Sequence, residues 1–381
     1  MKWHIVTGEY PPQPGGVSDY TRVVAHGLVA AGDAVHIWAP RTEQPELADR
    51  DITVHRMAGR FGAQAIRQLD TDLAAAGAGK LLIQYVPQAF GWKGMNLPFC
   101  IWLYARRKLA PTVMFHEVMY PLERGRALRE NLLGAVSCVM AALAARAAAR
   151  IFVATPLWQE ILATRVNVSR PSAWLPLPST IPVIRDEAGV LEVRRRLGVA
   201  NGILVGHFSS YPAPTRPLLE RLIPPALQGN ASLAAILIGA DSEACRAAIA
   251  ANAPELASRV HATGRLASAD LSRHLAACDL MLQLYPDGAC ARRTTLIAAI
   301  AHGRPVVSTT GRATEALWAQ SGAIAIADAA DEAAIGETLA ELTGDPDLRA
   351  RYARAARALY RDRFDVRHTI AMLRDNPCGS Q

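Results

Sequence analysis

Short apolar runs recur along the chain and alternate with longer segments whose apolar residues lie three or four positions apart. Runs at residues 3–7, 80–86 and 203–208 predict buried strands, and the spaced pattern between such runs predicts amphipathic helices. Strands that alternate with helices are typical of parallel sheets, because parallel strands need a crossover connection. The pattern therefore predicts an α/β protein in which helices cover parallel sheets.

The predicted elements form two series separated by a proline-rich stretch. The predicted strands are residues 3–7, 35–39, 52–56, 80–86, 112–115, 151–154, 203–208, 233–239, 260–264, 280–285, 306–307 and 323–326. The predicted helices are residues 18–31, 63–76, 124–149, 217–227, 242–251 and 269–276, one after Arg293, and two more that end near residue 363. Residues 176–189 are proline-rich and not periodic, which predicts a linker. We therefore expect two doubly wound domains facing across a cleft, at residues 1–178 and 179–362, with residues 363–381 packing back on the first.

The segment 279–312 predicts a strand, a loop, a helix and a second strand. Its loop carries Arg292 and Arg293 just before the helix, where free backbone amides attract anions. Arg293 precedes the apolar residues Leu296 and Ile300 by three and seven positions, so it is predicted to lie on the same, sheet-facing side of the helix. A charge there is expensive to bury without a partner. A bound phosphate would be a suitable partner.

Two other places at predicted strand ends carry candidate functional residues. Gly15 and Gly16 precede the first helix, for which Ser18 is the expected N-cap, and glycine lets the backbone approach a ligand closely. His116 and Glu117 follow the strand at 112–115, so they lie at the edge of the sheet where such folds bind ligands. Turns also use paired glycines, and a histidine near a helix start can serve the structure alone. Structural roles therefore remain alternatives at both places.

Composition narrows the class of partner. A length of 381 residues and a hydrophobic content of 51% allow two ordinary cores. The net charge of +7 is scattered, with no long basic block, which disfavours nucleic acid and leaves an anionic small substrate or an acidic membrane surface. Arginine far outnumbers lysine and alanine is abundant, which is typical of a GC-rich genome.

The same composition predicts a cytoplasmic location. The six cysteines form no C-x-x-C pair and have no histidine spacing suited to zinc, so free thiols in a reducing compartment are expected. Met1 leads directly into a strand-like run, and no apolar run reaches the roughly 18 residues of a membrane span. The helix at 124–149 begins with Arg124, Arg126 and Arg129. An ordinary packed helix with solvated arginines is favoured there, and a helical face that binds acidic lipid at the inner side of the membrane is the alternative.

Together these landmarks resemble the retaining, nucleotide-sugar-dependent glycosyltransferases of GT-B architecture. This family includes phosphatidylinositol mannosyltransferases and bacterial capsule and lipopolysaccharide transferases. EYPPQPGGVSDYTRVVAHGLVAAGDAVHIWAP resembles the opening strand, glycine loop and first helix of the family. HATGRLASADLSRHLAACDLML resembles its G-x-hydrophobic, helix, A-x-C/A-D and strand pattern, and IAAIAHGRPVVST resembles its E-A-M-A-x-G-x-P-V-V segment. The resemblance covers nearly the whole chain.

The resemblance implies an acceptor-side amino-terminal domain and a carboxyl-terminal domain that binds a nucleoside diphosphate sugar as substrate, without a cofactor. Acceptors in the family are glycans, lipid-linked molecules or small molecules with a hydroxyl group. Gly16 would meet the donor phosphate through its amide, His116 would lie near the transferred sugar, and backbone atoms at Leu266 would hold the base. The residues then expected to bind the donor are Gly15, Gly16, His207, Arg216, Arg265, Leu266, Asp287, Gly288, Arg292, Arg293, Thr294, Thr310 and Gly311, and those expected at the reacting centre are His116, Asp287 and Arg293.

The sequence departs from the family at its acidic pair. Alignment on the Gly303 and Pro305 positions places Cys290 and Ala298 where the two glutamates of E-x7-E usually stand. The second glutamate ordinarily holds the nucleotide ribose, which an alanine cannot do. Asp287 could replace the first glutamate.

The family's phosphate-binding cations are altered as well. His207 stands at the usual arginine, and Arg216 is the nearest later cation. The pair Arg292 and Arg293 could compensate for the missing cations.

Transfer from a nucleoside diphosphate sugar requires neutralisation of the departing diphosphate. A metal held by D-x-D is one solution, but the three D-x-D matches, at residues 70–72, 49–51 and 345–347, lie on a helix, before a strand and at a helix start. Cationic side chains and helix amides, without a metal, are therefore expected.

Three alternatives remain. One is a protein of the same fold that binds nucleotide sugars or partners without catalysis, which the residues at 290 and 298 suggest. Another is a sugar epimerase of the same fold, for which the sequence offers no clear acid and base pair. The third, a dehydrogenase, is disfavoured because no G-x-G-x-x-G follows the first strand.

Overall fold

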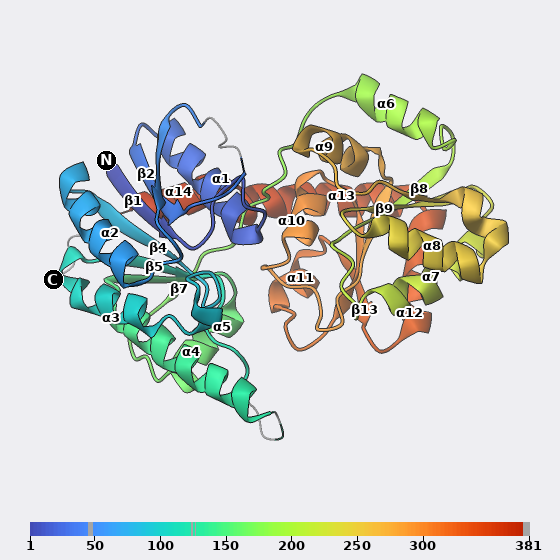
Figure 1. Ribbon diagram of the computed structural model, residues 1–381. Coiled ribbons are helices and arrows are strands. Elements are labelled where there is room, and N and C mark those ends of the chain that lie inside the picture. The colour runs from blue at the N-terminus through green and yellow to red at the C-terminus, as the bar shows by residue number, and fades with distance from the viewer. Residues whose placement is uncertain (45–48, 123–124, 126, 376–381) are drawn as a thin grey trace. The chain divides into compact units, whose positions relative to one another are not determined.

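The computed structural model describes residues 1–44, 49–122, 125 and 127–375. The chain forms two compact units (Figure 1). Unit 1 contains Met1–Pro178 and the segment that begins at Val366, and unit 2 contains Ser179–Asp365. Each unit is built on a parallel sheet, which confirms the predicted α/β class.

The sheet of unit 1 has seven parallel strands in the order β3-β2-β1-β4-β5-β6-β7. The strands are β1 (Lys2–Thr7), β2 (Ala34–Pro40), β3 (Ile52–Met57), β4 (Lys80–Tyr85), β5 (Thr112–Phe115), β6 (Arg150–Val153) and β7 (Ala173–Trp174). The helices of this unit are α1 (Gly16–Ala30), α2 (Ala63–Ala76), α3 (Leu97–Ala105), α4 (Leu128–Ala147), α5 (Pro156–Thr164) and α14 (Val366–Arg374), with 3-10 turns η1 (Trp92–Gly94) and η2 (Arg107–Leu109).

Two hydrophobic layers hold this sheet between its helices. Side chains alternate along a strand, so neighbours such as Ile5 and Val6 enter opposite layers. Helices α2, α3 and α4 cover the Val6 face, and α1 and α14 cover the Ile5 face. Helix α14 is packed closely on α1, because a Cβ at Gly27 would lie 2.8 Å from Ile370. The last described helix of the chain is thereby part of unit 1.

Helix α1 begins two residues earlier than the sequence predicts. Gly15 is its N-cap, so the expected N-cap residue Ser18 lies inside the helix, and its hydroxyl donates to the Gln13 carbonyl at 2.6 Å. The amides of Val17 and Ser18 bind the Glu9 carboxylate instead. The prediction failed because the capping group comes from the preceding strand-end loop and not from the residue next to the helix.

Helix α4 is shorter than predicted, and apolar residues near its start are exposed. It begins at Leu128; the predicted start with Arg124 and Arg126 lies outside the described residues. By length and composition alone α4 could cross a membrane, as buried helices of water-soluble proteins also can. Met140 and Ala144 on this helix are fully buried in unit 1, whereas Leu128 is 87% exposed.

Three histidines lie on neighbouring strands of unit 1. His36 Nδ1 is 3.0 Å from His55 Nε2, and the rings of His4 and His36 are 5.2 Å apart. The indole of Trp38 stacks on His55. Burial lowers the pKa of all three imidazoles below the usual value. The fold therefore favours their neutral forms.

Acidification from about pH 8 to about pH 5 is expected to lower the free energy of unfolding of unit 1. A histidine with a lowered folded-state pKa binds more protons when unfolded, so stability present above the unfolded pKa of about 6.5 is lost as the pH falls. Urea denaturation followed by tryptophan fluorescence at several pH values checks this. His36→Asn should weaken the dependence, and equal stability at both pH values would contradict the expectation.

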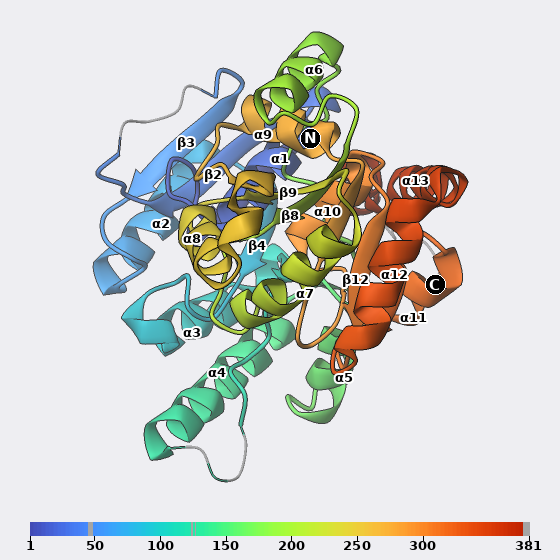
Figure 2. The ribbon, with the colours of Figure 1, turned by 90° about the vertical axis from the view of Figure 1, so that its right-hand side faces the viewer.

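The sheet of unit 2 has six parallel strands in the order β10-β9-β8-β11-β12-β13. The strands are β8 (Ile203–Phe208), β9 (Leu233–Ile238), β10 (Val260–Ala262), β11 (Leu280–Gln283), β12 (Val306–Thr310) and β13 (Ala325–Asp328). The helices are α6 (Glu187–Arg196), α7 (Arg216–Gly229), α8 (Ser242–Asn252), α9 (Ser268–Ala277), α10 (Thr294–Ala301), α11 (Ala316–Ser321), α12 (Glu332–Gly344) and α13 (Pro346–Leu359), with the 3-10 turn η3 (Pro254–Arg259) and the π-helical turn η4 (Tyr360–Phe364). Helices α7, α8 and α12 pack on one face of this sheet (Figure 2).

The proline-rich stretch is shorter than predicted. Helix α6 begins at Glu187, inside the predicted linker 176–189. Asp186 caps it by accepting the Gly189 amide at 2.9 Å. Local capping by an aspartate explains why a helix forms so soon after the prolines.

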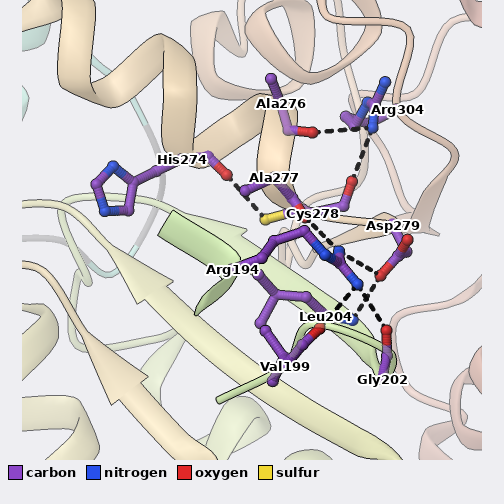
Figure 3. A network of polar contacts seen from close by, with 10 residues as sticks. All are labelled: Arg194, Val199, Gly202, Leu204, His274, Ala276, Ala277, Cys278, Asp279 and Arg304. Atoms are coloured by element: carbon purple, nitrogen blue, oxygen red, sulfur yellow. Dashed lines mark hydrogen bonds and ion pairs between the residues drawn. The ribbon is translucent and has the colours of Figure 1, made fainter. Parts of the chain in front are cut away.

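A polar network ties α6 to the sheet of unit 2 (Figure 3). The guanidinium of Arg194 donates to Asp279 Oδ2 at 2.9 Å and to the Gly202 carbonyl at 2.6 Å. The same Asp279 oxygen accepts the Leu204 amide of β8 at 2.7 Å. Arg304 donates to the Cys278 carbonyl at 2.9 Å. The A-x-C-D motif that contributed to the family resemblance therefore has a structural role here.

Candidate functional site

The strand order of unit 2 reverses between β8 and β11, which lie next to each other in the sheet. Loops that follow the two strands on either side of such a reversal diverge and leave room for a ligand at the carboxyl edge. The loop after β11 contains Asp287, Gly288, Arg292 and Arg293. The topology therefore places the predicted phosphate loop where ligands bind in this class of sheet.

The two arginines of this loop share one carboxylate. Arg292 Nη2 donates to Asp287 Oδ2 at 3.2 Å, and Arg293 forms an ion pair with Asp287 Oδ1. The guanidinium of Arg293 also lies over the Tyr285 ring, 4.8 Å from its centre. The partner that a charge at this position needs is supplied, in part, by Asp287 of the same loop. Asp287 alone does not balance the charge of both arginines, and Glu315, which accepts the Ala291 amide, is a second carboxylate at this loop.

Part of this cluster remains available to hydrogen-bond acceptors. The Arg293 side chain is 26% exposed, and its Nε is buried with no hydrogen-bond partner among the described residues. A buried donor without an acceptor is costly unless a ligand or water supplies one. The exposed part of the Arg293 guanidinium group is compatible with an additional anion beside the Asp287 carboxylate, whereas the buried Nε is out of reach of a ligand in this conformation.

Glycines fix the backbone of this loop against the loop that follows β12. Gly288 has φ +94°, and a Cβ there would lie 2.4 Å from the Gly311 amide nitrogen. A Cβ at Gly311 would in turn lie 2.5 Å from the Asp287 carbonyl carbon. The Ala313 amide donates to the Asp287 carbonyl at 2.9 Å. Because neither glycine can carry a side chain without movement, this contact fixes the position of Asp287.

A carboxylate that the sequence analysis missed holds the other end of the loop. Glu315 accepts the Ala291 amide at 3.1 Å and the indole N–H of Trp318 at 2.8 Å. Cys290 and Ala298, which stand where the family has its glutamates, are 1% and 0% exposed. Burial also raises the pKa of the Cys290 thiol. Neither side chain is presented to a ligand.

His207 and Arg216, the other two residues predicted to bind the donor phosphates, lie in different surroundings. His207 is 2% exposed, its Nδ1 lies 2.5 Å from the Leu282 carbonyl, and burial lowers its pKa to about 4. It is thus a neutral residue inside the unit, which argues against the predicted contact with a donor. Arg216 is half-buried at the start of α7, where its Nε donates to the Tyr211 carbonyl at 2.8 Å.

The other predicted donor-binding residues of unit 2 follow strand ends. Arg265 is exposed and Leu266 is half-buried after β10. Thr294 is the first residue of α10, which no side chain caps. Thr310 is half-buried at the end of β12, with its hydroxyl 3.4 Å from the Ala327 carbonyl, and Gly311 follows it.

Unit 1 has its own reversal of strand order, between β1 and β4. The loop after β1 carries Gly15 and Gly16, and Glu9 lies beneath it. Glu9 Oε1 accepts the amides of Val17 and Ser18, each at 3.1 Å, and a Cβ at Gly15 would lie 2.2 Å from the same oxygen. Nothing lies within 4 Å of a Cβ at Gly16, which is exposed. Of the loop glycines, Gly16 is therefore the one open to a ligand.

His116 lies one strand further along the same edge. Its Nε2 is 2.8 Å from Gln84 Oε1, and the Tyr20 ring of α1 approaches it edge-on at 4.7 Å. With the Gln84 oxygen facing Nε2, the imidazole proton lies on Nε2 and Nδ1 is an acceptor; the reversed amide would give the unpartnered Gln84 Nε2 an acceptor and exchange these roles. Burial lowers the pKa of His116 to about 3. The side chain is a neutral, positioned hydrogen-bonding group.

The first aspartate of each D-x-D match serves the fold. Asp70 lies on α2 and binds Arg106 and the Trp102 indole, and Asp345 caps α13. Asp49 binds Tyr10 and Arg22. Among the described residues, no three histidine, cysteine, aspartate or glutamate side chains are grouped so that they could hold a metal ion.

Comparisons with known proteins relate both units to glycosyltransferases. Residues 202–345, less than half of the chain, match the family described as "Glycosyl transferases group 1". No curated protein matches the sequence. Among solved structures, HepE of Anabaena in complex with UDP matches with a TM-score of 0.71 and 18% identity over 98% of both chains. WaaG, a glycosyltransferase involved in lipopolysaccharide biosynthesis, matches with a TM-score of 0.68 and 14% identity over 98% of this chain and all of its own.

Sucrose-phosphate synthase of Thermosynechococcus elongatus is a third match, with a TM-score of 0.70 and 16% identity over 98% of this chain and 97% of its own. At these identities the matches show the fold, which is the GT-B fold with two parallel-sheet α/β domains. The match of residues 202–345 and the shared fold support a glycosyltransferase.

Proposed function

We propose that the protein transfers a sugar from a nucleoside diphosphate sugar to a hydroxyl group, without a metal ion and with retention of configuration at the sugar. The observation that carries the proposal is the cluster of Arg292, Arg293 and Asp287 at the strand reversal of unit 2. The cluster lies inside the segment that matches the glycosyltransferase family. HepE, which shares the fold, binds UDP-glucose in its crystal structure.

The arginines supply the chemistry that a leaving diphosphate requires. Negative charge grows on the diphosphate as the sugar departs, and preorganised cations stabilise it most where water is excluded. Arg292 and Arg293 would take the phosphate oxygens, and the α10 amino terminus at Thr294 would add backbone dipoles. Asp287 pairs with both arginines, and its side chain would turn to the sugar once phosphate replaces it.

The remaining steps need no dedicated base. The acceptor hydroxyl would attack on the face from which the diphosphate leaves, and its proton would pass to the departing phosphate oxygen. His116 would position the sugar, since its neutral Nδ1 can accept a hydrogen bond from a sugar hydroxyl. Gly16 would offer its backbone amide to the donor, beside the amides that Glu9 already occupies.

A two-stage experiment tests the proposal. Purified protein is first screened by thermal shift against UDP-, GDP-, ADP- and dTDP-sugars, because a ligand that binds only the folded state raises its melting temperature. The stabilising donor is then incubated with lipid-linked and soluble acceptors, with and without EDTA, and the anomeric configuration of the product is determined. Loss of activity with EDTA, or an inverted product, would contradict the proposed mechanism.

A second candidate is a nucleotide-sugar-binding protein without catalysis. It is favoured by the buried Cys290 and Ala298, which leave the family's two glutamate positions without a ligand-facing carboxylate. Hydrolysis or transfer of a nucleotide sugar by the purified protein would exclude this candidate. Donor binding without any turnover would support it.

An acceptor at a membrane surface is part of the same proposal, for a protein that works in the cytoplasm. Leu128 and Leu132 of α4 are 87% and 58% exposed, and Arg129 beside them is exposed too. Apolar side chains next to a cation suit the interface of an acidic membrane. Co-sedimentation of the wild-type protein and of Leu128→Glu with phosphatidylglycerol–phosphatidylethanolamine vesicles tests this contact, and equal sedimentation of the two would contradict it.

A further inference from the structure

A four-residue turn at the carboxyl edge of unit 1 has a backbone that its side chains disfavour. Residues Gly91, Trp92, Lys93 and Gly94 have φ values of +85°, +53°, +54° and +84°. Glycine adopts such values readily, but for tryptophan and lysine they are costly. Strain of this kind persists only where the surrounding structure enforces it, and it gathers at functional sites.

The surrounding structure does enforce this turn. Asn96 is fully buried, and its amide donates to the carbonyls of Phe61 and Phe90 at 2.9 and 2.8 Å. A Cβ at Gly91 would lie 2.8 Å from the Arg60 side chain, and one at Gly94 would lie 3.0 Å from the Tyr120 hydroxyl. Loops that follow β3 and β5 therefore clamp the turn on both sides.

The strain does not help to bury the tryptophan. The Trp92 side chain is 56% exposed, the highest value among the tryptophans, whereas Trp3 and Trp38 are fully buried. An exposed indole contributes little to the core and still leaves a large apolar face in water. The turn therefore presents the indole to solvent in a fixed position.

The place of the turn indicates what the indole meets. It follows β4, which lies beside β1 at the strand reversal of unit 1. The loop after β4 also contacts the end of β1, since a Cβ at Gly8 would lie 2.4 Å from Ala89. A ligand at this reversal would lie between the glycine loop after β1 and the turn that carries Trp92.

Polar groups next to the turn suit a saccharide. Lys93 is exposed within the turn, and Gln88 Nε2 donates to Glu117 Oε2 at 2.8 Å nearby in the loops after β4 and β5. A pyranose ring has an apolar face of C–H groups and a rim of hydroxyls. An exposed aromatic face suits the C–H face of the ring, and the polar side chains of the loops after β4 and β5 can bind hydroxyls.

We propose that Trp92 is the stacking platform for a saccharide ring of the acceptor, and thereby a residue that determines acceptor specificity. The proposal rests on the proposed transferase function. It assigns the acceptor to the class of glycosides, in which the receiving hydroxyl belongs to a sugar, and it assigns no role to Trp92 toward the donor.

The test uses the full-length protein and a panel of octyl and p-nitrophenyl glycosides of glucose, galactose, mannose and N-acetylglucosamine. Binding is measured without donor by saturation-transfer NMR, and transfer is measured with the donor found by thermal shift. Trp92→Ala is expected to raise the KM for the glycoside about tenfold, which corresponds to about 1.4 kcal/mol. Trp92→Phe should recover most of the loss, and the KM for the donor should stay unchanged.

Trp92→Gly separates function from stability. Glycine tolerates φ +53°, so this variant should unfold at an unchanged or higher temperature while it loses glycoside affinity as Trp92→Ala does. Ile101→Ala is the matched control, because Ile101 is 53% exposed on the following helix α3 and lies outside the turn. This control should retain glycoside binding.

Four outcomes would overturn the proposal. In the first, the wild-type protein binds no glycoside of the panel, and in the second, Trp92→Ala leaves the acceptor KM unchanged. In the third, Trp92→Ala lowers the affinity for the donor and not for the acceptor. In the fourth, the only effect of Trp92→Ala is weaker co-sedimentation with phosphatidylglycerol–phosphatidylethanolamine vesicles. The last would make Trp92 a membrane contact. Glycoside binding that depends on Trp92 in a protein without transfer activity would instead contradict the proposed function and leave the platform in place.

Discussion

Arg293→Ala is expected to reduce donor turnover at least about a hundredfold, the usual effect of removing one preorganised group that stabilises transition-state charge. Arg293 is one of the two cations that Asp287 holds at the strand reversal of unit 2, and its buried Nε has no partner among the described residues. The loss should appear in kcat as well as in kcat/KM, because charge on the diphosphate grows during the reaction. Steady-state kinetics with the identified donor measure both.

The fold should tolerate this change. Arg292 remains to pair with Asp287, and partly exposed ion pairs contribute only about 0–1 kcal/mol. The melting temperature should therefore fall by no more than a few degrees. Arg221→Ala is a matched control, since Arg221 is an arginine of the same unit that pairs with one carboxylate, Glu332, outside the loop. Full activity of Arg293→Ala would remove Arg293 as a phosphate ligand.

His116→Ala is expected to lower turnover about a hundredfold while the affinity for the free nucleotide changes less than about twofold. A general positioning effect of this size is typical of a group that orients the reacting sugar. His116 belongs to unit 1, whereas the predicted base and phosphate ligands other than the glycine loop belong to unit 2. Isothermal titration with the nucleoside diphosphate and steady-state kinetics separate the two quantities.

The pH profile adds a second readout for His116. Burial holds its pKa at about 3, so its neutral form persists as the pH falls through 6.5. The activity of the wild-type protein should therefore show no inflection from this histidine between about pH 5 and pH 8. Equal losses of turnover and nucleotide affinity in His116→Ala, together with a lowered melting temperature, would indicate that the contact with Gln84 is only structural.

Most strands were predictable because buried parallel strands are apolar runs bounded by turns, and β5 has the predicted bounds. The two-residue strand β7 was not predicted. Helix α2, which buries one face, also has the predicted bounds. Helix α3 was missed because LPFCIWLYA is apolar on all sides and has no helical periodicity. Helix α6 was missed for the opposite reason, since it is short, charged and mostly exposed after a run of prolines. Periodicity is informative only where a helix has one buried face.

The site was predictable to the level of segments but not of contacts. Arg292, Arg293 and Asp287 were singled out by the sequence analysis. Their mutual pairing, however, depends on a loop shape that is set by the contact of Gly288 with Gly311, which is distant in the sequence. Glu9 and Glu315 were missed because each binds backbone amides of another segment, eight or more residues away. A carboxylate with such a role has no signature in the local sequence.

The ion pairs of Asp287 with the two arginines affect how tightly a donor can bind. A group tethered in the same loop is present at a high effective concentration, so under the proposed function a donor diphosphate would compete with the protein's own anion for the arginines. The measured Kd is then the intrinsic value divided by the fraction of molecules whose arginines are unoccupied. Tightness of the Gly288–Gly311 contact, which fixes the Asp287 backbone, would thereby adjust donor affinity without any change to the two arginines.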